Sequence, residues 1–357
     1  MEFISLHQQR TVKERLWLKF PKQIRILVAK IKDPKMSRIE TYEERLVRSL
    51  VNREVDVLLY LSQTYVPIMD IPYVAVVWDL AHRLHPYFPE VSNQGEWERR
   101  ERGYGIRLKR AVSLITGTKV GQTEIQQFYQ IPEERIKVLP FPTPQFALDA
   151  SNHCTDSVLS KYQLPKNYLF YPAQFWPHKN HVGLLLAVKW LRDRYDLIFP
   201  VVFTGSDKGN QTYVRQIVND LNLSQQVHFL GFVSQDDLVS IYQNAFALTF
   251  LTFFGPDNLP PLEAFALKCP VIASEVPGAQ EQLGDAALLV NPKSVEEIAL
   301  AIKSLLEDDN LRETLIQRGL IKAAQWSTKD YAEGIFEILD DFETIRRCWS
   351  SRDSWCF

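Results

Sequence analysis

FALTFLTFFGPDNLPPLEAFALKCPVIAS, residues 246–274, contains both kinds of segment from which the fold is built. FALTF (246–250) and PVIAS (270–274) are short and almost entirely apolar, a pattern typical of strands buried in a parallel sheet. PLEAFALK (261–268) lies between them and predicts a helix. A strand, a helix and a second strand in this order form the repeating unit of a parallel sheet with helices packed on its faces.

The same alternation runs through most of the chain. We expect strands at 56–62, 72–79, 113–118, 167–173, 200–205, 227–232, 246–250, 270–274 and 287–290. Helical segments separate most of them, so the sequence predicts an α/β fold with two doubly wound parallel sheets that face a cleft. Ligands would bind at the carboxyl ends of the strands. Nearer the N-terminus, QIRILVAKI (23–31) indicates one short strand at most.

Three parts of the chain follow from this pattern. We predict an N-terminal domain over 1–145, a C-terminal domain over 146–328, and a closing helix with a tail over 329–357. RIKVLPFPTP (135–144) is punctuated by proline and predicts a linker. The closing helix carries apolar residues on one face: Tyr331, Ile335, Ile338, Leu339 and Phe342. We expect that face to pack back toward the N-terminal domain.

Composition narrows the class of protein. The chain has 357 residues, of which 46% are hydrophobic and 24% charged, with a formal net charge of −2. This balance is typical of a globular protein and argues against a nucleic-acid partner. Four cysteines without CxxC spacing indicate neither a disulfide framework nor a zinc site, and no apolar run reaches the roughly 18 residues of a membrane span. We therefore expect a cytoplasmic protein.

The charge is unevenly distributed near the N-terminus. The segment from Arg10 to Arg38 contains ten lysine and arginine residues against Glu14 and Asp33. Residues 12–32 leave two interpretations open: peripheral contact with an anionic membrane at its inner face, or an amphipathic helix that packs on the protein with its basic face in solvent.

A stiff loop precedes a single carboxylate, Glu263. Asn258 is a candidate N-cap, and Pro260 or Pro261 suits the first helical position, so a helix begins just past a strand. The unpaired N–H groups and positive dipole end of such a helix favour an anion such as a pyrophosphate. Glu263 in the first turn can then accept hydrogen bonds from a ribose diol. The alternative is that it only complements the helix dipole.

A second candidate anion site lies in YPAQFWPHKNH, residues 171–181. This stretch predicts a strand, a polar loop and the first turn of a helix, which places Lys179 where a phosphate would bind. His178 and His181 lie beside the lysine, but no third ligand accompanies them, so the metal signal is weak. The alternative is a solvated loop in which Asn180 begins the helix.

These segments together resemble family 4 of the retaining glycosyltransferases, which have the GT-B fold. The resemblance covers roughly 55–345 and is most specific over 165–305. It rests on these stretches: VVWDLAHRLHPYF (76–88), RIKVLPFPTP (135–144), YPAQFWPHKNH (171–181), HFLGFVSQDDLVSIYQNA (228–245), NLPPLEAFALKCPVIASEVPGAQEQLGDAALLV (258–290) and AAQWSTKDYAEGIFEIL (323–339).

The resemblance implies roles for the charged positions of the donor site. Lys179 would hold the diphosphate of a nucleotide-sugar, and Glu263 would bind the nucleotide ribose. Gln174 stands where most family members carry an arginine, so one positive charge is absent there.

The resemblance also implies roles for two loops. Asp257, Asn258 and Leu259 would offer backbone N–H groups to the phosphates and to the transferred sugar. Phe232 and Val233 would line the pocket of the base.

The loop before Glu263 departs from the usual family pattern. Most members carry two glutamates separated by seven residues, and here Gly255 occupies the first position. The stretch resembles a branch with a Gly-Pro-x-Asn loop that often acts in bacterial surface-polysaccharide assembly. A Gly-Pro turn can fix the same N–H groups, but the lost carboxylate leaves the identity of the sugar open.

The resemblance implies a retaining glycosyltransferase that moves a sugar, with mannose the candidate, from a nucleotide-sugar to a glycan or lipid-linked acceptor. It implies same-face attack assisted by the leaving phosphate, which requires no metal and no cofactor. The sequence offers no matched carboxylate pair of the kind that glycosidases use. The alternative interpretation is a catalytically impaired homologue that serves as a binding or scaffold subunit.

On the acceptor side we expect Asp79, His82 and Arg83 to face the sugar and acceptor. Family members usually have a histidine immediately before this aspartate, where Trp78 stands here. The alternative is an aspartate that caps a helix beside a surface histidine. Four further charged residues are unranked candidates for the same face, although a charged helix explains the arginines best: Glu90, Arg99, Arg100 and Arg102.

The start of the chain also departs from the family. Members normally open with a strand and a glycine-rich loop, whereas no glycine precedes Gly95 here. Either the N-terminal domain is shortened or the sequence begins downstream of the usual start.

Overall fold

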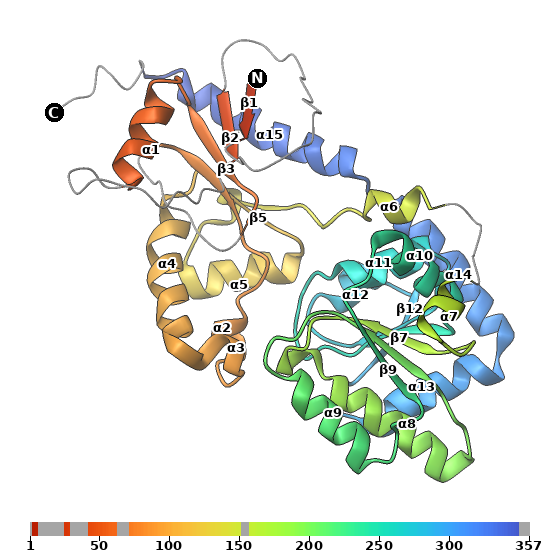
Figure 1. Cartoon of the computed structure of the whole chain (residues 1–357). Helices are drawn as coiled ribbons and strands as arrows, with labels where there is room; N and C mark the ends of the chain where they lie inside the picture. Colours follow the sequence, from red (N-terminus) through yellow and green to blue (C-terminus); the bar gives the residue numbers. More distant parts are fainter. Residues whose placement is uncertain (1, 6–24, 29–41, 63–70, 151–156, 350–357) are drawn as a thin grey trace.

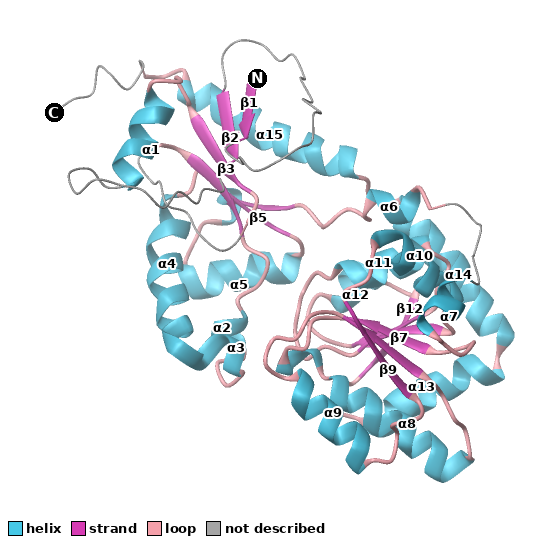
Figure 2. Cartoon of the chain, in the orientation of Figure 1, coloured by secondary structure: helices cyan, strands magenta, loops and turns pink. Residues whose placement is uncertain are grey.

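The computed structural model describes residues 2–5, 25–28, 42–62, 71–150 and 157–349 (Figure 1). These residues build two α/β units, each around a six-stranded parallel sheet with helices against it (Figure 2). The basic segment at 12–32, apart from the strand at 25–28, lies outside the described residues, and so does its expected membrane contact.

The first sheet runs β1-β2-β3-β4-β5-β6 and the second β12-β11-β10-β7-β8-β9. The first contains β1 (Glu2–Ser5), β2 (Arg25–Val28), β3 (Val57–Tyr60), β4 (Tyr73–Val76), β5 (Ser113–Thr116) and β6 (Ile136–Val138). The second contains β7 (Leu169–Pro172), β8 (Val201–Thr204), β9 (Val227–Gly231), β10 (Ala247–Phe250), β11 (Val271–Ser274) and β12 (Ala287–Val290).

Helices connect and cover the strands. Those of the first part are α1 (Tyr42–Val51), α2 (Ala81–Leu84), α3 (Pro89–Ser92), η1 (Asn93–Gly95), α4 (Glu96–Arg110), α5 (Lys119–Tyr129), η2 (Glu133–Arg135) and α6 (Gln145–Leu148). Those that follow are α7 (Ser157–Tyr162), η3 (Pro177–Lys179), α8 (His181–Tyr195), α9 (Gln211–Asp220), α10 (Gln235–Asn244), α11 (Leu259–Ala266), α12 (Ala279–Leu283), α13 (Val295–Glu307), α14 (Asp309–Ala324) and α15 (Thr328–Arg346).

Each of the nine expected strands is present, and the differences lie in the first sheet. Residues 136–138 form the edge strand β6, where the sequence analysis expected only a linker. Three residues are too few to show an alternating pattern. Two short strands, β1 and β2, pair in parallel where we expected one at most.

The first sheet has its strands side by side in chain order. Right-handed crossovers between consecutive neighbours place their helices on one face of a sheet, and α1, α4 and α5 all pack there. That core contains Leu46, Leu50, Leu58, Tyr60, Tyr73, Ala75, Tyr104, Leu108, Leu114, Ile125 and Tyr129. The opposite face therefore needs a cover from elsewhere in the chain, because a parallel sheet is buried on both sides.

Helix α15 supplies that cover. After the second domain the chain returns, and α15 lies against the first sheet (Figure 1). The apolar face that the sequence analysis identified contributes to a third core with alternate strand residues: Val57, Leu59, Val74, Val76, Ile115, Ile335, Ile338, Leu339 and Phe342. Ser327 begins this helix with a capping box to Asp330.

The second sheet reverses its strand order between β7 and β10. The chain connections leave these two neighbours in opposite directions, which opens a crevice at their carboxyl ends. The loops that follow them, 173–180 and 251–258, contain the two candidate anion sites of the sequence analysis. The fold therefore brings those sites together.

Truncating α15 at its buried face should destabilise the first sheet. Leu339 has no exposed surface, and Leu339→Ala should cost about 3 kcal/mol of unfolding free energy through lost burial and a residual cavity. Ile345→Ala on the same helix is the control, because Ile345 is 59% exposed and should change stability by about 0.5 kcal/mol or less. Urea unfolding followed by circular dichroism measures both. Equal losses would contradict the role of α15 as the cover of this sheet.

Candidate functional site

Lys179 lies in the crevice between β7 and β10. It ends the short helix η3, and its Nζ lies 4.9 Å from the centroid of the Phe250 ring, at the end of β10. Although part of its surface is exposed, the amino group lies deep among protein atoms, and this desolvation lowers the pKa of Lys179 to about 8. The charges of Asp79 and Glu90, both from the first domain, act in the opposite direction. A charged lysine here is poorly solvated and suited to an anion.

The two crevice loops are joined by hydrogen bonds. The backbone N–H of Phe253 donates to the carbonyl of His178 at 2.8 Å, and Thr252 Oγ1 donates to the same carbonyl at 3.3 Å. Lys179 and the loop that leads to α11 therefore belong to one unit.

The histidines beside Lys179 are structural. His181 stacks between Tyr171 and Phe175, with ring centroids 4.9 and 4.5 Å apart, and burial lowers its pKa to about 3. His178 stacks on Phe254 at 4.2 Å and is bound by Glu90. Within the residues that the structure describes, no group of three or more His, Cys, Asp and Glu side chains could hold a metal ion.

Helix α11 begins at Leu259, with Asn258 at the N-cap position. The Asn258 side chain does not cap the helix; instead its Nδ2 donates to the carbonyl of Gly255 at 2.7 Å and closes the Gly-Pro turn. The backbone N–H of Asn258 donates to Gln282 Oε1 at 3.0 Å. That N–H is therefore engaged within the protein in this arrangement, although we had expected it to bind a ligand phosphate.

Asp257 reaches across to the first domain. Its Oδ2 accepts a hydrogen bond from the backbone N–H of Phe141 at 2.9 Å, and its Oδ1 accepts one from Gln282. Burial raises the pKa of Asp257 to about 7, and the nearby charge of Glu281 adds to the shift. A Cβ atom at Gly117 would lie 2.0 Å from Oδ2, so only glycine admits this close approach.

Glu263 is held by a buried tyrosine. The hydroxyl of Tyr242 donates to Glu263 Oε2 at 2.7 Å, and burial raises the pKa of Glu263. Because α11 begins at Leu259, Glu263 lies beyond the first turn in which we had expected it, so it does not complement the helix dipole there. The carboxylate is partly buried and is oriented by the tyrosine.

The remaining positions of the expected donor site differ in exposure. Phe232 is 91% exposed after β9, whereas its neighbour Val233 is buried. Gln174 is exposed, and its Oε1 accepts a hydrogen bond from Trp176 Nε1 at 3.0 Å. A large aromatic ring without cover suits stacking against a planar ligand.

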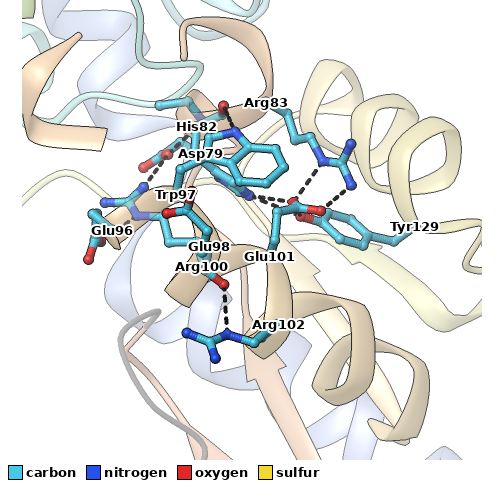
Figure 3. A network of polar contacts seen from close by, with 11 residues as sticks. Asp79, His82, Arg83, Glu96, Trp97, Glu98, Arg100, Glu101, Arg102 and Tyr129 are labelled. Atoms are coloured by element: carbon cyan, nitrogen blue, oxygen red, sulfur yellow. Dashed lines mark hydrogen bonds and ion pairs between the residues drawn. The ribbon is translucent and has the colours of Figure 1, made fainter. Parts of the chain in front are cut away.

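His82, which we expected to face the sugar and acceptor, is buried, and both it and Arg83 take part in a polar network with Glu101 (Figure 3). The His82 side chain is fully buried, and its Nε2 lies 2.9 Å from Glu101 Oε1 and 3.0 Å from the Tyr129 hydroxyl. Arg83 forms a two-point ion pair with Glu101, and its guanidinium lies near the ring of Trp97. Both side chains are engaged in this network because their short helix α2 lies beside Glu101 of α4 and Tyr129 of α5, although Arg83 stays partly exposed.

Asp79 occupies a different environment. Its Oδ1 accepts a hydrogen bond from the backbone N–H of Ala81 at 2.9 Å and lies 3.5 Å from Arg100 Nη1. The side chain is 26% exposed. Asp79 thus binds the first N–H of α2 from the position before the N-cap residue Leu80, close to the alternative interpretation, and its charge acts on Lys179 across the domain boundary.

Several residues hold the domains together, a role that the sequence did not indicate even for Glu90, which it had named without a ranking. Glu90 in α3 accepts hydrogen bonds from the backbone and side chain of His178, and Phe88 stacks on Phe253 at 5.9 Å. Glu281 accepts the backbone N–H of Lys119, at 2.8 Å and 3.0 Å from its two oxygens. Of the residues named at the domain contact, Gly117 was recognisable from the sequence, because a glycine at the end of a strand indicates close approach of another segment.

Comparison with known proteins agrees with this geometry. Residues 160–322 match the family model of glycosyl transferases group 1. O-antigen chain mannosyltransferase B of Escherichia coli is 30% identical over 221 residues, which are 62% of this chain and 58% of that protein.

Two solved structures superpose on most of the chain. Sucrose-phosphate synthase from Thermosynechococcus elongatus has a TM-score of 0.71 at 17% identity and covers 90% of this chain and 89% of its own. Anabaena HepE in complex with UDP has a TM-score of 0.67 at 19% identity, with coverages of 84% and 82%.

The chain thus has the GT-B fold and resembles O-antigen mannosyltransferases, as the sequence motifs implied. It spans little more than half the length of that curated relative. Membership of family 4 stays a prediction.

A side chain at position 117 should loosen the contact between the domains. Gly117→Ala places a methyl group against the Asp257 carboxylate, which must move and give up the Phe141 N–H. We expect a loss of about 1–3 kcal/mol, measured by thermal unfolding. Gly105→Ala is the control, because no atom lies within 4 Å of the added carbon. Equal stability of the two variants would contradict the close approach.

Proposed function

We propose that the chain is a retaining, metal-independent glycosyltransferase that acts in cell-surface polysaccharide synthesis. It would move a sugar, with mannose the candidate, from a nucleotide-sugar to a glycan or lipid-linked acceptor. The observation that carries the proposal is the position of Lys179 and the start of α11 at the strand-order reversal of the second sheet. The match to glycosyl transferases group 1 and the similarity to an O-antigen mannosyltransferase support the same function.

In this proposal the donor lies along the second domain. Its diphosphate binds between the Lys179 ammonium group and the amino end of α11. Glu263, oriented by Tyr242, accepts hydrogen bonds from the ribose hydroxyls. Phe232 stacks on the base beside Val233. The structural neighbour HepE, described in complex with UDP, supports a nucleotide ligand.

The transfer needs no protein nucleophile. The acceptor oxygen attacks the anomeric carbon from the face that the diphosphate leaves, a C–O bond to the acceptor forms, and the bond to the phosphate breaks. The acceptor proton passes to the departing phosphate. The protein positions the two substrates, and Lys179 with the positive dipole end of α11 stabilises the charge that develops on the leaving group.

Partners and location follow from the same proposal. The substrates are a nucleotide-sugar and an acceptor, with no separate cofactor and no nucleic acid. None of the helices that the structure describes is long and apolar enough to cross a bilayer. We propose a cytoplasmic protein, with peripheral contact at the inner membrane face as the arrangement that a lipid-linked acceptor would favour.

One observation favours a second candidate, a binding or scaffold subunit without turnover. His82 and Arg83, the expected acceptor-side residues, are engaged by Glu101 and Tyr129. Gly255 also replaces a carboxylate usual in the family. The two candidates share donor binding and differ in whether any acceptor is modified.

Replacing the donor-site residues should separate diphosphate binding from nucleoside binding. Lys179→Ala should weaken binding of nucleoside diphosphates by about tenfold or more and leave nucleoside binding nearly unchanged, because only the diphosphate contacts the lysine. Glu263→Ala should weaken both. A thermal-shift panel of GDP-, UDP- and ADP-sugars identifies the donor, since only a bound ligand stabilises by mass action. Lys189→Ala, on the exposed side of α8, is the control. Unchanged binding in both site variants would remove the donor-site assignment.

Diphosphate binding should weaken as the pH rises through the lysine titration. The pKa of Lys179 is about 8 without ligand, so at pH 9 most molecules have a neutral amine, and binding must recover a proton at a cost of about tenfold in affinity. Calorimetric titration of UDP and GDP from pH 7 to 9.5 measures this dependence and the accompanying proton uptake. Lys179→Ala should remove it. An identical pH profile in the variant would show that another group is responsible.

A further inference from the structure

A cleft of about 160 Å³ lies between the carboxyl end of β4 and helix α4, apart from the donor-site residues. Its lining is Trp78, Asp79, Arg99, Arg100, Gly103, Tyr104 and Arg107. Three guanidinium groups and one carboxylate thus face one small space. Trp78, which is 39% exposed, and Tyr104 add aromatic walls.

Two of these arginines are held in place by Glu96. Arg99 donates from Nε and Nη2 to the two oxygens of Glu96 at 2.7 Å each, and Arg100 donates from Nε to Oε1 at 2.7 Å. These ion pairs lower the pKa of Glu96 to about 2. A guanidinium group has five N–H donors, so each arginine keeps donors beyond those that Glu96 takes.

The charge and shape of the cleft suit a phosphate group. The planar fork of arginine matches phosphate oxygens and binds them in pairs. Even with Glu96 counted, the guanidinium groups outnumber the carboxylates. Gly103 leaves the space open, since a Cβ there would lie 3.2 Å from Arg107 Nη1. A glycine inside a helix costs about 1 kcal/mol relative to alanine, so this opening is maintained at the expense of helix stability.

The position of the cleft indicates which ligand would use it. Asp79 lines the cleft and also acts electrostatically on Lys179 across the domain boundary. A molecule bound in the cleft would thus lie on the first-domain side, within electrostatic reach of the donor lysine.

We propose that this cleft binds a phosphate group carried by the acceptor, with Arg99 and Arg100 as its principal contacts. That the phosphate belongs to the acceptor rests on the proposed function. The anion site itself rests on the lining of the cleft and does not depend on that function. A plain charged helix is the competing explanation, and Arg102 exemplifies it: that residue is not part of the cleft lining, and its Nε donates to the carbonyl of Glu98 (Figure 3).

Calorimetric titration of the full chain with inorganic pyrophosphate tests the site. We expect two binding events, one lost in Lys179→Ala and the other in Arg99→Gln/Arg100→Gln, where affinity should fall by about tenfold or more. Arg102→Gln is the matched control on α4 and should keep both events. Retention of both in the double variant would overturn the proposal. Retention of both in Lys179→Ala would instead remove the donor-site assignment and leave the arginine site standing.

A second variant distinguishes loss of the binding site from loss of the fold. Gly103→Leu fills the cleft without removing a charge, and leucine suits a helix better than glycine. It should abolish the arginine-dependent event and keep the Lys179-dependent one. Full binding in this variant would also overturn the proposal.

The source of the phosphate is then distinguished directly. One arm uses inorganic pyrophosphate in solution, and the other uses phosphatidylcholine vesicles with and without polyprenyl phosphate. Stronger binding of the wild type than of the double variant to the polyprenyl phosphate vesicles assigns a lipid-linked acceptor. A difference seen with pyrophosphate alone assigns a soluble phosphorylated acceptor, and no difference in either arm contradicts the site.

Discussion

A parallel sheet must be buried on both faces, and this constraint shapes the whole molecule. In the first domain the strands follow one another in chain order, so the described connecting helices gather on one side. Within the part of the chain that the structure describes, the other side is covered by α15, which returns from beyond the second domain. The first sheet therefore depends on a helix nearly 200 residues away, and the two domains are joined by two chain crossings as well as by contacts.

The second sheet satisfies the same constraint by reversing its strand order. The reversal opens a crevice where β7 and β10 end, and the loops that leave it carry Lys179 and lead to α11. Hydrogen bonds join these two loops into one unit. Glu90 of the first domain accepts a hydrogen bond from this unit, and Phe88 stacks on it. Phe253 and Phe254, at the start of the stiff loop, thereby serve the contact between domains. The loop between β10 and α11 thus contributes both to the contact between the domains and to the candidate donor site.

The sequence predicted best what depends on local pattern. Apolar runs identified nine strands, and the positions of Lys179 and Glu263 followed from strand-loop-helix order. Side-chain partners were harder, because they come from distant segments: Glu101 and Tyr129 bury His82, and Phe141 binds Asp257. Strand β6 was missed because three residues show no period. The cleft lined by Arg100 required knowledge of which face of α4 meets β4, since Arg100 and Arg102 look alike in sequence.

The dependence on α15 has a consequence for biosynthesis. A ribosome that adds about 5–20 residues per second completes β6 roughly ten to forty seconds before α15 emerges. Among the residues that the structure describes, α15 supplies the main cover of the Val57 and Val74 face, so this face lacks that cover throughout the interval. Completion of the first-domain core thus waits for the synthesis of α15, and a chaperone that shields apolar surface would act on this face first.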